Sequence, residues 1–342
     1  MSEPTVNTER VEVNLHLYPH ATYSDAMSFE QHAMEADIMA PEMHLGSKGG
    51  KQLQRLASGE EKMYSKIEAL IDPGDRQFAR GILDIIQQRS HMPKPFSAPL
   101  LDVPLSAEWR EKMDTIRFLE GSLITKPTLS DTLEVTLQGL KINTGLQNER
   151  EGIIADNVMR YLASYPTTRD PDEDKTVMLI PIGSLHFDLK KKLVDRGLAV
   201  TISQNSDIVT PQYGPYHARA WRVVKQGEIP SEELLMKSLI CSLIADQDTR
   251  GRDLIHCEDS IVKSAAEVRI TDIAATLGLE ALCQEVIKLS KRKGLGGLYD
   301  AADQIMLSVT GQARLEGQAA VEHFLMATST PNSATSQKSI RN

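Results

Sequence analysis

The sequence predicts a mixed α/β protein in which two βαβ-like halves form a largely parallel sheet, with a helical insertion and a helical C-terminal extension. Three observations predict this class. Residues 11–18 (VEVNLHLY) alternate strictly between apolar and polar side chains, as strands do. Residues 176–182 (TVMLIPI) form a continuous apolar run, which is typical of a strand buried on both faces. The segments between and after these two carry apolar residues mostly at helical spacing.

The first half begins with the strand 11–18. Ser24 or Asp25 can then cap a helix that runs to about Ala36. Residues 37–43 (DIMAPEM) are short and apolar, and Pro41 places this second strand at an edge or at its own end.

The second half repeats the order. After the strand 176–182 we expect a helix over about 187–196, a terminating Gly197 and a strand over 198–203. A histidine follows the first strand of each half, His20 in one and His186 in the other. Strand, helix and strand in this order favour parallel pairing through crossover connections.

The remaining chain reads as mostly helical. The insertion, about residues 46–165, has helical periodicity over 60–70, 75–89, 107–121 and 148–165. One further strand is predicted within 213–224 (HARAWRVV), and Gly294–Gly297 reads as a flexible linker. The predicted organisation is a flexible N-terminus (1–10), an α/β core (11–225), a helical extension (226–327) and a disordered tail (328–342).

Composition narrows the function classes. The formal net charge of -9 and the absence of a clustered Lys/Arg excess argue against nucleic acid as a partner. Three cysteines fit no zinc or disulfide pattern, so we expect reduced thiols. The polar N-terminus and the lack of an apolar stretch of about 18 to 20 residues predict a cytoplasmic protein without a membrane partner.

The clearest candidate for chemistry is Gly183-x-x-His186. The glycine lets the chain turn out of the sheet, and the histidine then lies at the carboxyl end of a strand, where open parallel sheets bind ligands. His20 occupies the matching place in the first half. The alternative is that His186 only caps the following helix.

Glu42 and His44 lie at the end of the second predicted strand and point to one face of an extended chain. Together with His20 and His186 they offer the nitrogen and oxygen ligands that zinc, manganese or cobalt accept. The alternative is that all four are satisfied polar groups at strand ends.

Glu149, Arg150 and Glu151 open the predicted helix 148–165. Acids in a first helical turn are favoured by the helix dipole, whereas a cation opposes it. Arg150 is therefore a candidate for binding a carboxylate, a phosphate or a developing oxyanion. A solvent-facing arginine is the alternative.

In this order the features resemble the superfamily that groups the Tiki proteases, the TraB and PrgY pheromone-shutdown proteins, the erythromycin esterases and the ChaN-like haem-uptake proteins. The likeness covers about residues 11–205. It is carried by His20, by Glu42, by Arg150 within NERE and by the GSLH that ends at His186.

The resemblance implies a hydrolase of peptide or ester bonds with a small-molecule or peptide substrate. Two mechanisms stay open. A divalent metal (Mn, Co or Zn) held by His20, Glu42 and His186 would activate water or a carbonyl, with Arg150 on the negative end of the substrate. Without a metal, a histidine and Glu42 would act as general base and its partner.

The second hypothesis is a ligand-binding or regulatory protein that keeps the fold without the chemistry. Leu17 stands where the family's first motif has glycine, and the helical extension has no counterpart in the resemblance. Metal content and turnover of generic ester and peptide substrates discriminate between the two.

Overall fold

The computed structural model describes residues 8–18, 23–43, 45–71, 76–101, 111, 115, 128–165, 175–183, 186, 188–204, 215–245, 254–257 and 259–329. The chain divides into two compact units. Unit 1 comprises residues 1–110 and 145–209, and unit 2 comprises residues 111–144 and 210–342.

Unit 1 contains a four-stranded parallel sheet built from β1 (Val11–Tyr18), β2 (Ile38–Met39), β3 (Thr176–Gly183) and β4 (Ala199–Gln204). The strand order is β2-β3-β1-β4. The predicted α/β class with a parallel sheet is confirmed. The two halves interleave, because β3 lies between β1 and β2, and β1 lies between β3 and β4.

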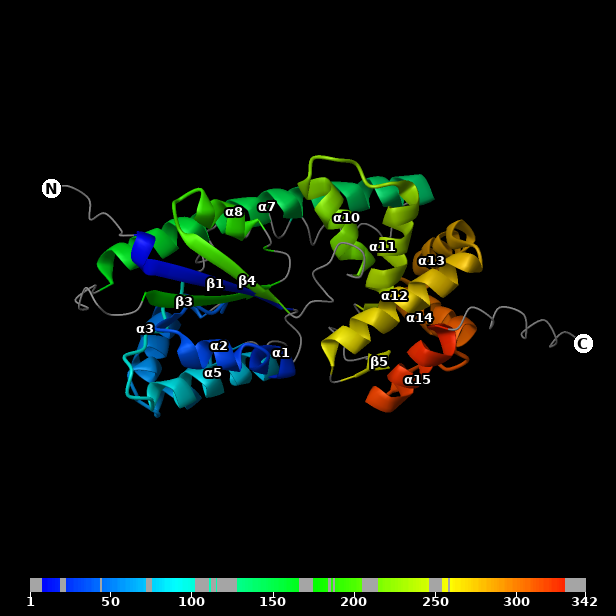
Figure 1. The fold of residues 1–342 in the computed structure, drawn as a ribbon. Helices are drawn as coiled ribbons and strands as arrows, with labels where there is room; N and C mark the ends of the chain where they lie inside the picture. Colours follow the sequence, from blue (N-terminus) through cyan, green and yellow to red (C-terminus); the bar gives the residue numbers. More distant parts are fainter. Residues whose placement is uncertain are drawn as a thin grey trace, which may run out of the picture. The chain divides into compact units, whose positions relative to one another are not determined.

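Helices cover both faces of this sheet (Figure 1). On one face lie α1 (Tyr23–Met27), α2 (Glu30–Glu35), α3 (Gly46–Ala57), α4 (Met63–Glu68) and α5 (Arg76–Ser90). On the other face lie α8 (Leu189–Val194) and the later part of α7 (Leu129–Ser164), whose apolar side chains pack against Val13, Leu15 and Leu17 of β1. The alternation that predicted β1 therefore separates two buried faces rather than one buried and one solvated face.

Two local predictions in the first half need correction. The helix expected from Ser24 or Asp25 to Ala36 is interrupted between α1 and α2. There Ser28 Oγ donates a hydrogen bond to the carbonyl of Asp25 (2.6 Å), an alternative to regular helical bonding. The second strand is only two residues long, and an isolated bridge between Ile38 and Ser97 covers its outer side.

Helix α7 differs most from its prediction. It begins at Leu129, where Thr128 and Asp131 exchange hydrogen bonds at the first turn, and not near residue 148. Arg150 therefore lies deep inside a long helix, and the dipole argument for it was wrong. The residues that Arg150 contacts in the folded protein, and not a helix end, explain why an arginine is buried there.

Unit 2 is mainly helical, in agreement with the predicted C-terminal helices. It contains α10 (Tyr216–Lys225), α11 (Glu232–Ala245), α12 (Ser260–Thr276), α13 (Leu279–Lys293), α14 (Leu295–Thr310), α15 (Gln318–Ser329) and a small parallel pair of β5 (Ile255–His256) and β6 (Leu315–Glu316). It has a hydrophobic core of its own, formed by residues such as Ile240, Ile270 and Met306.

The division into units differs from the domain boundary near residue 225 that the sequence predicts. Residues 111–144 and 210–225 belong to unit 2. Leu129, at the start of α7, packs against the helical core of this unit, and α10 packs against α11. Contacts between segments that are far apart in the sequence therefore set the boundary between the two units.

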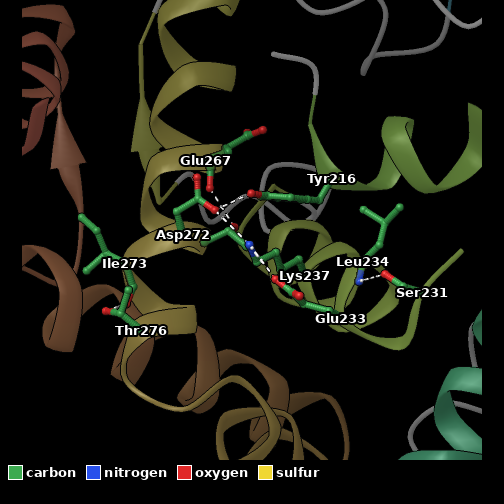
Figure 2. Close-up of polar contacts among 10 residues, drawn as sticks. Tyr216, Ser231, Glu233, Leu234, Lys237, Glu267, Asp272, Ile273 and Thr276 are labelled. Carbon is green, nitrogen blue, oxygen red and sulfur yellow. Dashed lines mark hydrogen bonds and ion pairs between the residues drawn. The ribbon is translucent and has the colours of Figure 1, made fainter. Parts of the chain in front are cut away.

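The strand predicted within 213–224 is wrong, because residues 216–225 form α10. Alanine and arginine favour helix over strand, and α10 is fastened to its helical neighbours. Tyr216 donates a hydrogen bond to Asp272 of α12, and Lys237 Nζ of α11 lies 3.3 Å from the same carboxylate and 3.2 Å from Glu233 (Figure 2). Burial and the Asp272 carboxylate raise the pKa of Tyr216, which keeps the phenol protonated as a donor.

Near both ends of the chain and at the glycine cluster, the described residues differ from their predictions. Residues 8–10, expected to be flexible, form a 3-10 turn, and α15 continues to Ser329. Residues 1–7 and 330–342, and most of the helix expected over 107–121, lie outside the described residues. Gly294–Gly297 is a tight junction between α13 and α14 rather than a flexible linker. None of the helices in the described part is long and apolar enough to cross a membrane.

Candidate functional site

Four charged side chains of unit 1 gather beyond the carboxyl ends of β2 and β3. Glu42 follows β2, His186 follows β3, and Arg150 and Glu151 project from α7. The exposed fractions of their side chains are 5% for Glu42, 9% for Arg150, 0% for Glu151 and 3% for His186. We call these residues the buried quartet.

Arg150 contacts two other members of the quartet, Glu42 and His186. Its Nη2 donates to Glu42 Oε1 at 2.5 Å, and its Nη1 lies 3.3 Å from His186 Nε2. The second oxygen of Glu42 accepts a hydrogen bond from the backbone N–H of Gly183 (2.8 Å). Glu42 is thereby held against the end of β3, and His186 Nε2 lies 3.5 Å from Glu42 Oε1.

Glu151 approaches the other side of the imidazole. Its Oε1 lies 3.5 Å from His186 Nδ1, which is an electrostatic contact longer than a good N–H···O hydrogen bond. Nδ1 has no hydrogen-bond partner among the described residues. The histidine is thus flanked by a carboxylate on each ring nitrogen and by a guanidinium on one of them.

The charges of the quartet explain the titration of His186. Burial by itself lowers the pKa of His186, and Arg150 acts in the same direction. Glu42 and Glu151 outweigh both, so the pKa of His186 is raised above its usual value. With His186 protonated, two carboxylates face two cations, and the formal charges of the quartet cancel.

The backbone around His186 forms a turn that leads into α8. The N–H of His186 donates to the carbonyl of Gly183 (2.9 Å), and the N–H of Leu189 donates to the carbonyl of His186 (3.0 Å). The imidazole, in contrast, points to Glu42, Arg150 and Glu151. The alternative that the His186 side chain merely caps the next helix does not describe its contacts.

The sequence-predicted residues Glu42, Arg150 and His186 are therefore brought together. His20 and His44 lie outside the described residues, so their part in the site remains a prediction. The register of the sheet pairs Tyr18, at the end of β1, with Gly183, at the end of β3. The strand that precedes His20 therefore ends on the edge of the sheet from which His186 projects.

The described members of the predicted metal set do not fit a divalent cation. Both oxygens of Glu42 are engaged by donors, and the guanidinium of Arg150 contacts both Glu42 Oε1 and His186 Nε2. A divalent cation in contact with both would be repelled by this fixed positive charge. Within the part of the chain that the structure describes, no group of three or more His, Cys, Asp and Glu side chains is arranged to hold a metal ion.

Glu151 is the member of the quartet that the sequence did not single out. A signal was present, because Glu151 occupies the same stripe of α7 as the buried Ile154, Ala155, Val158 and Leu162. An acid on the core-facing stripe of a helix must have a partner inside the protein. Placing the helix start near residue 148 hid this signal, since the dipole offered an easier explanation.

A second buried histidine, His16 of β1, lies on the opposite face of the sheet. Its Nδ1 lies 2.9 Å from Ser203 Oγ and its Nε2 lies 3.1 Å from Ser28 Oγ. The hydroxyl hydrogen of Ser28 is directed to the carbonyl of Asp25, and that of Ser203 is directed to Asn14 Oδ1 (2.8 Å), so both hydroxyl oxygens face the imidazole as acceptors. Burial, with the nearby His32, lowers the pKa of His16 to about 4. His16 is thus a neutral, hydrogen-bonded core residue that ties β1 to β4 and to the α1–α2 connection.

Comparisons of the chain with protein-family models, with curated proteins and with solved structures give no match.

Proposed function

We propose that this protein is a hydrolase of ester or peptide bonds in which His186 acts as general base without the help of a metal ion. The observation that carries the proposal is the position of His186 Nε2, at the carboxyl end of a central parallel strand and 3.3 Å from Arg150 Nη1. Open parallel sheets bind their ligands at this edge. The motif resemblance noted above points to the same reaction class.

The contacts define the protonation state that catalysis needs. Arginine can only donate, so a neutral His186 in contact with Arg150 Nη1 presents its lone pair on Nε2 and carries its hydrogen on Nδ1. When Arg150 Nη1 moves from Nε2 to the carbonyl oxygen of the substrate, the freed lone pair takes a proton from water, and the water oxygen forms the new bond to the carbonyl carbon. The negative charge on the former carbonyl oxygen develops beside Arg150. The imidazolium then returns the proton to the leaving oxygen or nitrogen as the scissile bond breaks.

The carboxylates support this cycle. A general base works best with a pKa close to the working pH, and Glu42 and Glu151 raise the pKa of His186 against the effect of burial. Arg150 serves two purposes, since it also neutralises Glu42 through the 2.5 Å contact. Activity should accordingly rise with pH as His186 loses its proton, with a midpoint above 6.5.

The second candidate function is a ligand-binding or regulatory role. The burial of the quartet favours it, because at most 9% of any of its side chains is exposed. A substrate must reach His186 for turnover, whereas a structural charge cluster needs no access.

A cytoplasmic location completes the proposal. Cys241, Cys257 and Cys283 are free and buried in unit 2, which suits a reducing compartment.

The test compares two histidines of similar burial in the same unit. The full-length protein is assayed with p-nitrophenyl esters and aminoacyl p-nitroanilides, as wild type, His186→Gln and His16→Gln. We expect His186→Gln to lower kcat/KM by about 100-fold or more, which is the usual contribution of a general base. His16→Gln should lower the melting temperature while the folded protein keeps its kcat.

Dialysis against EDTA is the metal control and should leave the activity unchanged. An activity that EDTA removes and manganese, cobalt or zinc restores would contradict the metal-free mechanism. A wild-type protein without turnover of any of these substrates, or equal loss of activity in both variants, would favour the binding role.

A further inference from the structure

We propose that Glu151 is a positioning residue that holds the imidazole of His186 in the tautomer with hydrogen on Nδ1 and the lone pair on Nε2. The inference deepens the proposed function, on which it depends only for its kinetic consequence. The tautomer itself can be tested whether or not the protein is an enzyme.

Glu151 lies on the face of α7 that packs against the sheet. Its side chain is fully buried on the stripe that packs Ile154 and Val158 against the sheet. A carboxylate transferred from water to such a place costs several kcal/mol of solvation free energy, so it needs a compensating partner. The imidazole of His186 faces it at 3.5 Å.

The two ring nitrogens of His186 face different neighbours. Arg150 Nη1 faces Nε2 and has no acceptor to offer, so it disfavours a hydrogen on Nε2 but does not itself bind a hydrogen on Nδ1. Nδ1 faces Glu151 Oε1, and a carboxylate is acceptor-only. Both neighbours therefore favour the same tautomer, each at its own ring nitrogen.

Glu42 is not placed to bind the hydrogen on Nδ1. Its Oε1 is bound by Arg150 and its Oε2 by the N–H of Gly183, and it faces Nε2 rather than Nδ1. Among the residues that the structure describes, Glu151 is the carboxylate on the Nδ1 side. When His186 takes up a proton, a movement of a few tenths of an ångström turns the 3.5 Å contact into a charge-assisted hydrogen bond.

The experiment reads the tautomer directly from the nitrogen-15 chemical shifts of the two ring nitrogens of His186, assigned with the His186→Gln variant. Wild type, Glu151→Gln and Glu151→Met are compared as full-length proteins above the pKa of His186. We expect the Nδ1-protonated form in wild type, its retention in Glu151→Gln, whose amide oxygen still accepts, and a mixture of tautomers in Glu151→Met. Methionine is similar in volume and apolar, so it removes the acceptor without opening a cavity.

Kinetics supply a second readout. If the protein is a hydrolase, Glu151→Met should lower kcat about tenfold or more with KM unchanged, and Glu151→Gln should restore part of it. The matched control is Asp37→Asn, another fully buried acid of unit 1, which pairs with Lys94 (2.8 Å) and should leave the ring nitrogens of His186 unchanged.

An Nδ1-protonated His186 in Glu151→Met would assign the tautomer to Arg150 alone and overturn the proposal, as would an Nε2-protonated wild type. Nitrogen shifts that behave as expected in a protein without hydrolytic activity would support the positioning role and reject only the hydrolase function.

Discussion

Two buried histidines show how the immediate neighbours of a residue decide its chemistry. His16 lies among uncharged hydroxyls and aromatic rings, where burial lowers its pKa to about 4. His186 is just as buried, but two carboxylates reverse the direction of the shift. Burial alone therefore predicts neither the charge of a histidine nor the direction of its pKa shift.

These opposite shifts predict opposite pH dependences of stability. The pKa of His16 is lowered in the folded protein, so the stability this site contributes is lost as the pH falls from about 6.5 to about 4. The loss amounts to about 3 kcal/mol, from about 1.4 kcal/mol per pKa unit. The pKa of His186 is raised, so its contribution is present below about 6.5 and is lost as the pH rises through the folded-state pKa.

Urea unfolding of wild type, His16→Gln and His186→Gln between about pH 4 and pH 9 measures the free energy of unfolding of each protein. The difference in this free energy between variant and wild type should become smaller at acid pH for His16→Gln and at alkaline pH for His186→Gln. Parallel curves for all three proteins would show that neither histidine titrates differently in the folded state.

At the scale of elements, two glycines define the junction between α13 and α14. Gly294 has a positive φ of 58° and ends α13, and α14 begins at the next residue. A Cβ built on Gly297 would lie 2.0 Å from the carbonyl oxygen of Leu289, whereas one built on Gly296 would have no neighbour within 4 Å. The junction is therefore tight because two backbones meet at Gly297.

This difference predicts that Gly297→Ala destabilises the protein although alanine favours helix. The neighbouring backbone has to move, because no flexible side chain can yield. We expect a loss of about 2 kcal/mol or more, the usual scale for forcing extra atoms into a packed site. Gly296→Ala is the matched control and should gain up to about 1 kcal/mol from helix propensity. Thermal unfolding measures both, and equal effects would mean that α13 and α14 do not meet as described.

At the scale of the whole molecule, each unit has its own hydrophobic core, and α7 contributes residues to both. In unit 2 the core extends to the last described helix, where Val321 and Phe324 of α15 are buried. The polar composition of residues 330–342 contains no apolar run able to bury surface.

We therefore expect that deletion of residues 330–342 leaves the melting temperature unchanged, while deletion from Gln318 onward destabilises the protein. The second deletion exposes the core that Val321 and Phe324 cover, at a cost of about 3 kcal/mol or more. Calorimetry of the two truncated proteins separates these outcomes. A large decrease for the shorter deletion would show that the tail stabilises the fold.

Several local features could be predicted from the sequence because they depend on neighbours along the chain. The alternation in residues 11–18 and the apolar run in 176–182 predicted β1 and β3 closely, and the parallel arrangement followed from the helices between strands. Glu42, Arg150 and His186 could be selected because a strand end or an unexplained charge is visible in one sequence.

What remained undetermined depends on contacts between distant segments. The strand order β2-β3-β1-β4, the helical state of residues 216–225 and the meeting of Glu151 with His186 are decided by tertiary packing. Periodicity shows that a residue is buried but not what it is buried against, which is why Glu151 could be read as an ordinary helix-start acid. The sequence by itself determined β1, β3 and the parallel α/β class, and it selected Glu42, Arg150 and His186 as candidates. Only the folded structure, in which segments more than 100 residues apart such as Glu42 and Arg150 come into contact, decided how these residues share charge and hydrogen bonds.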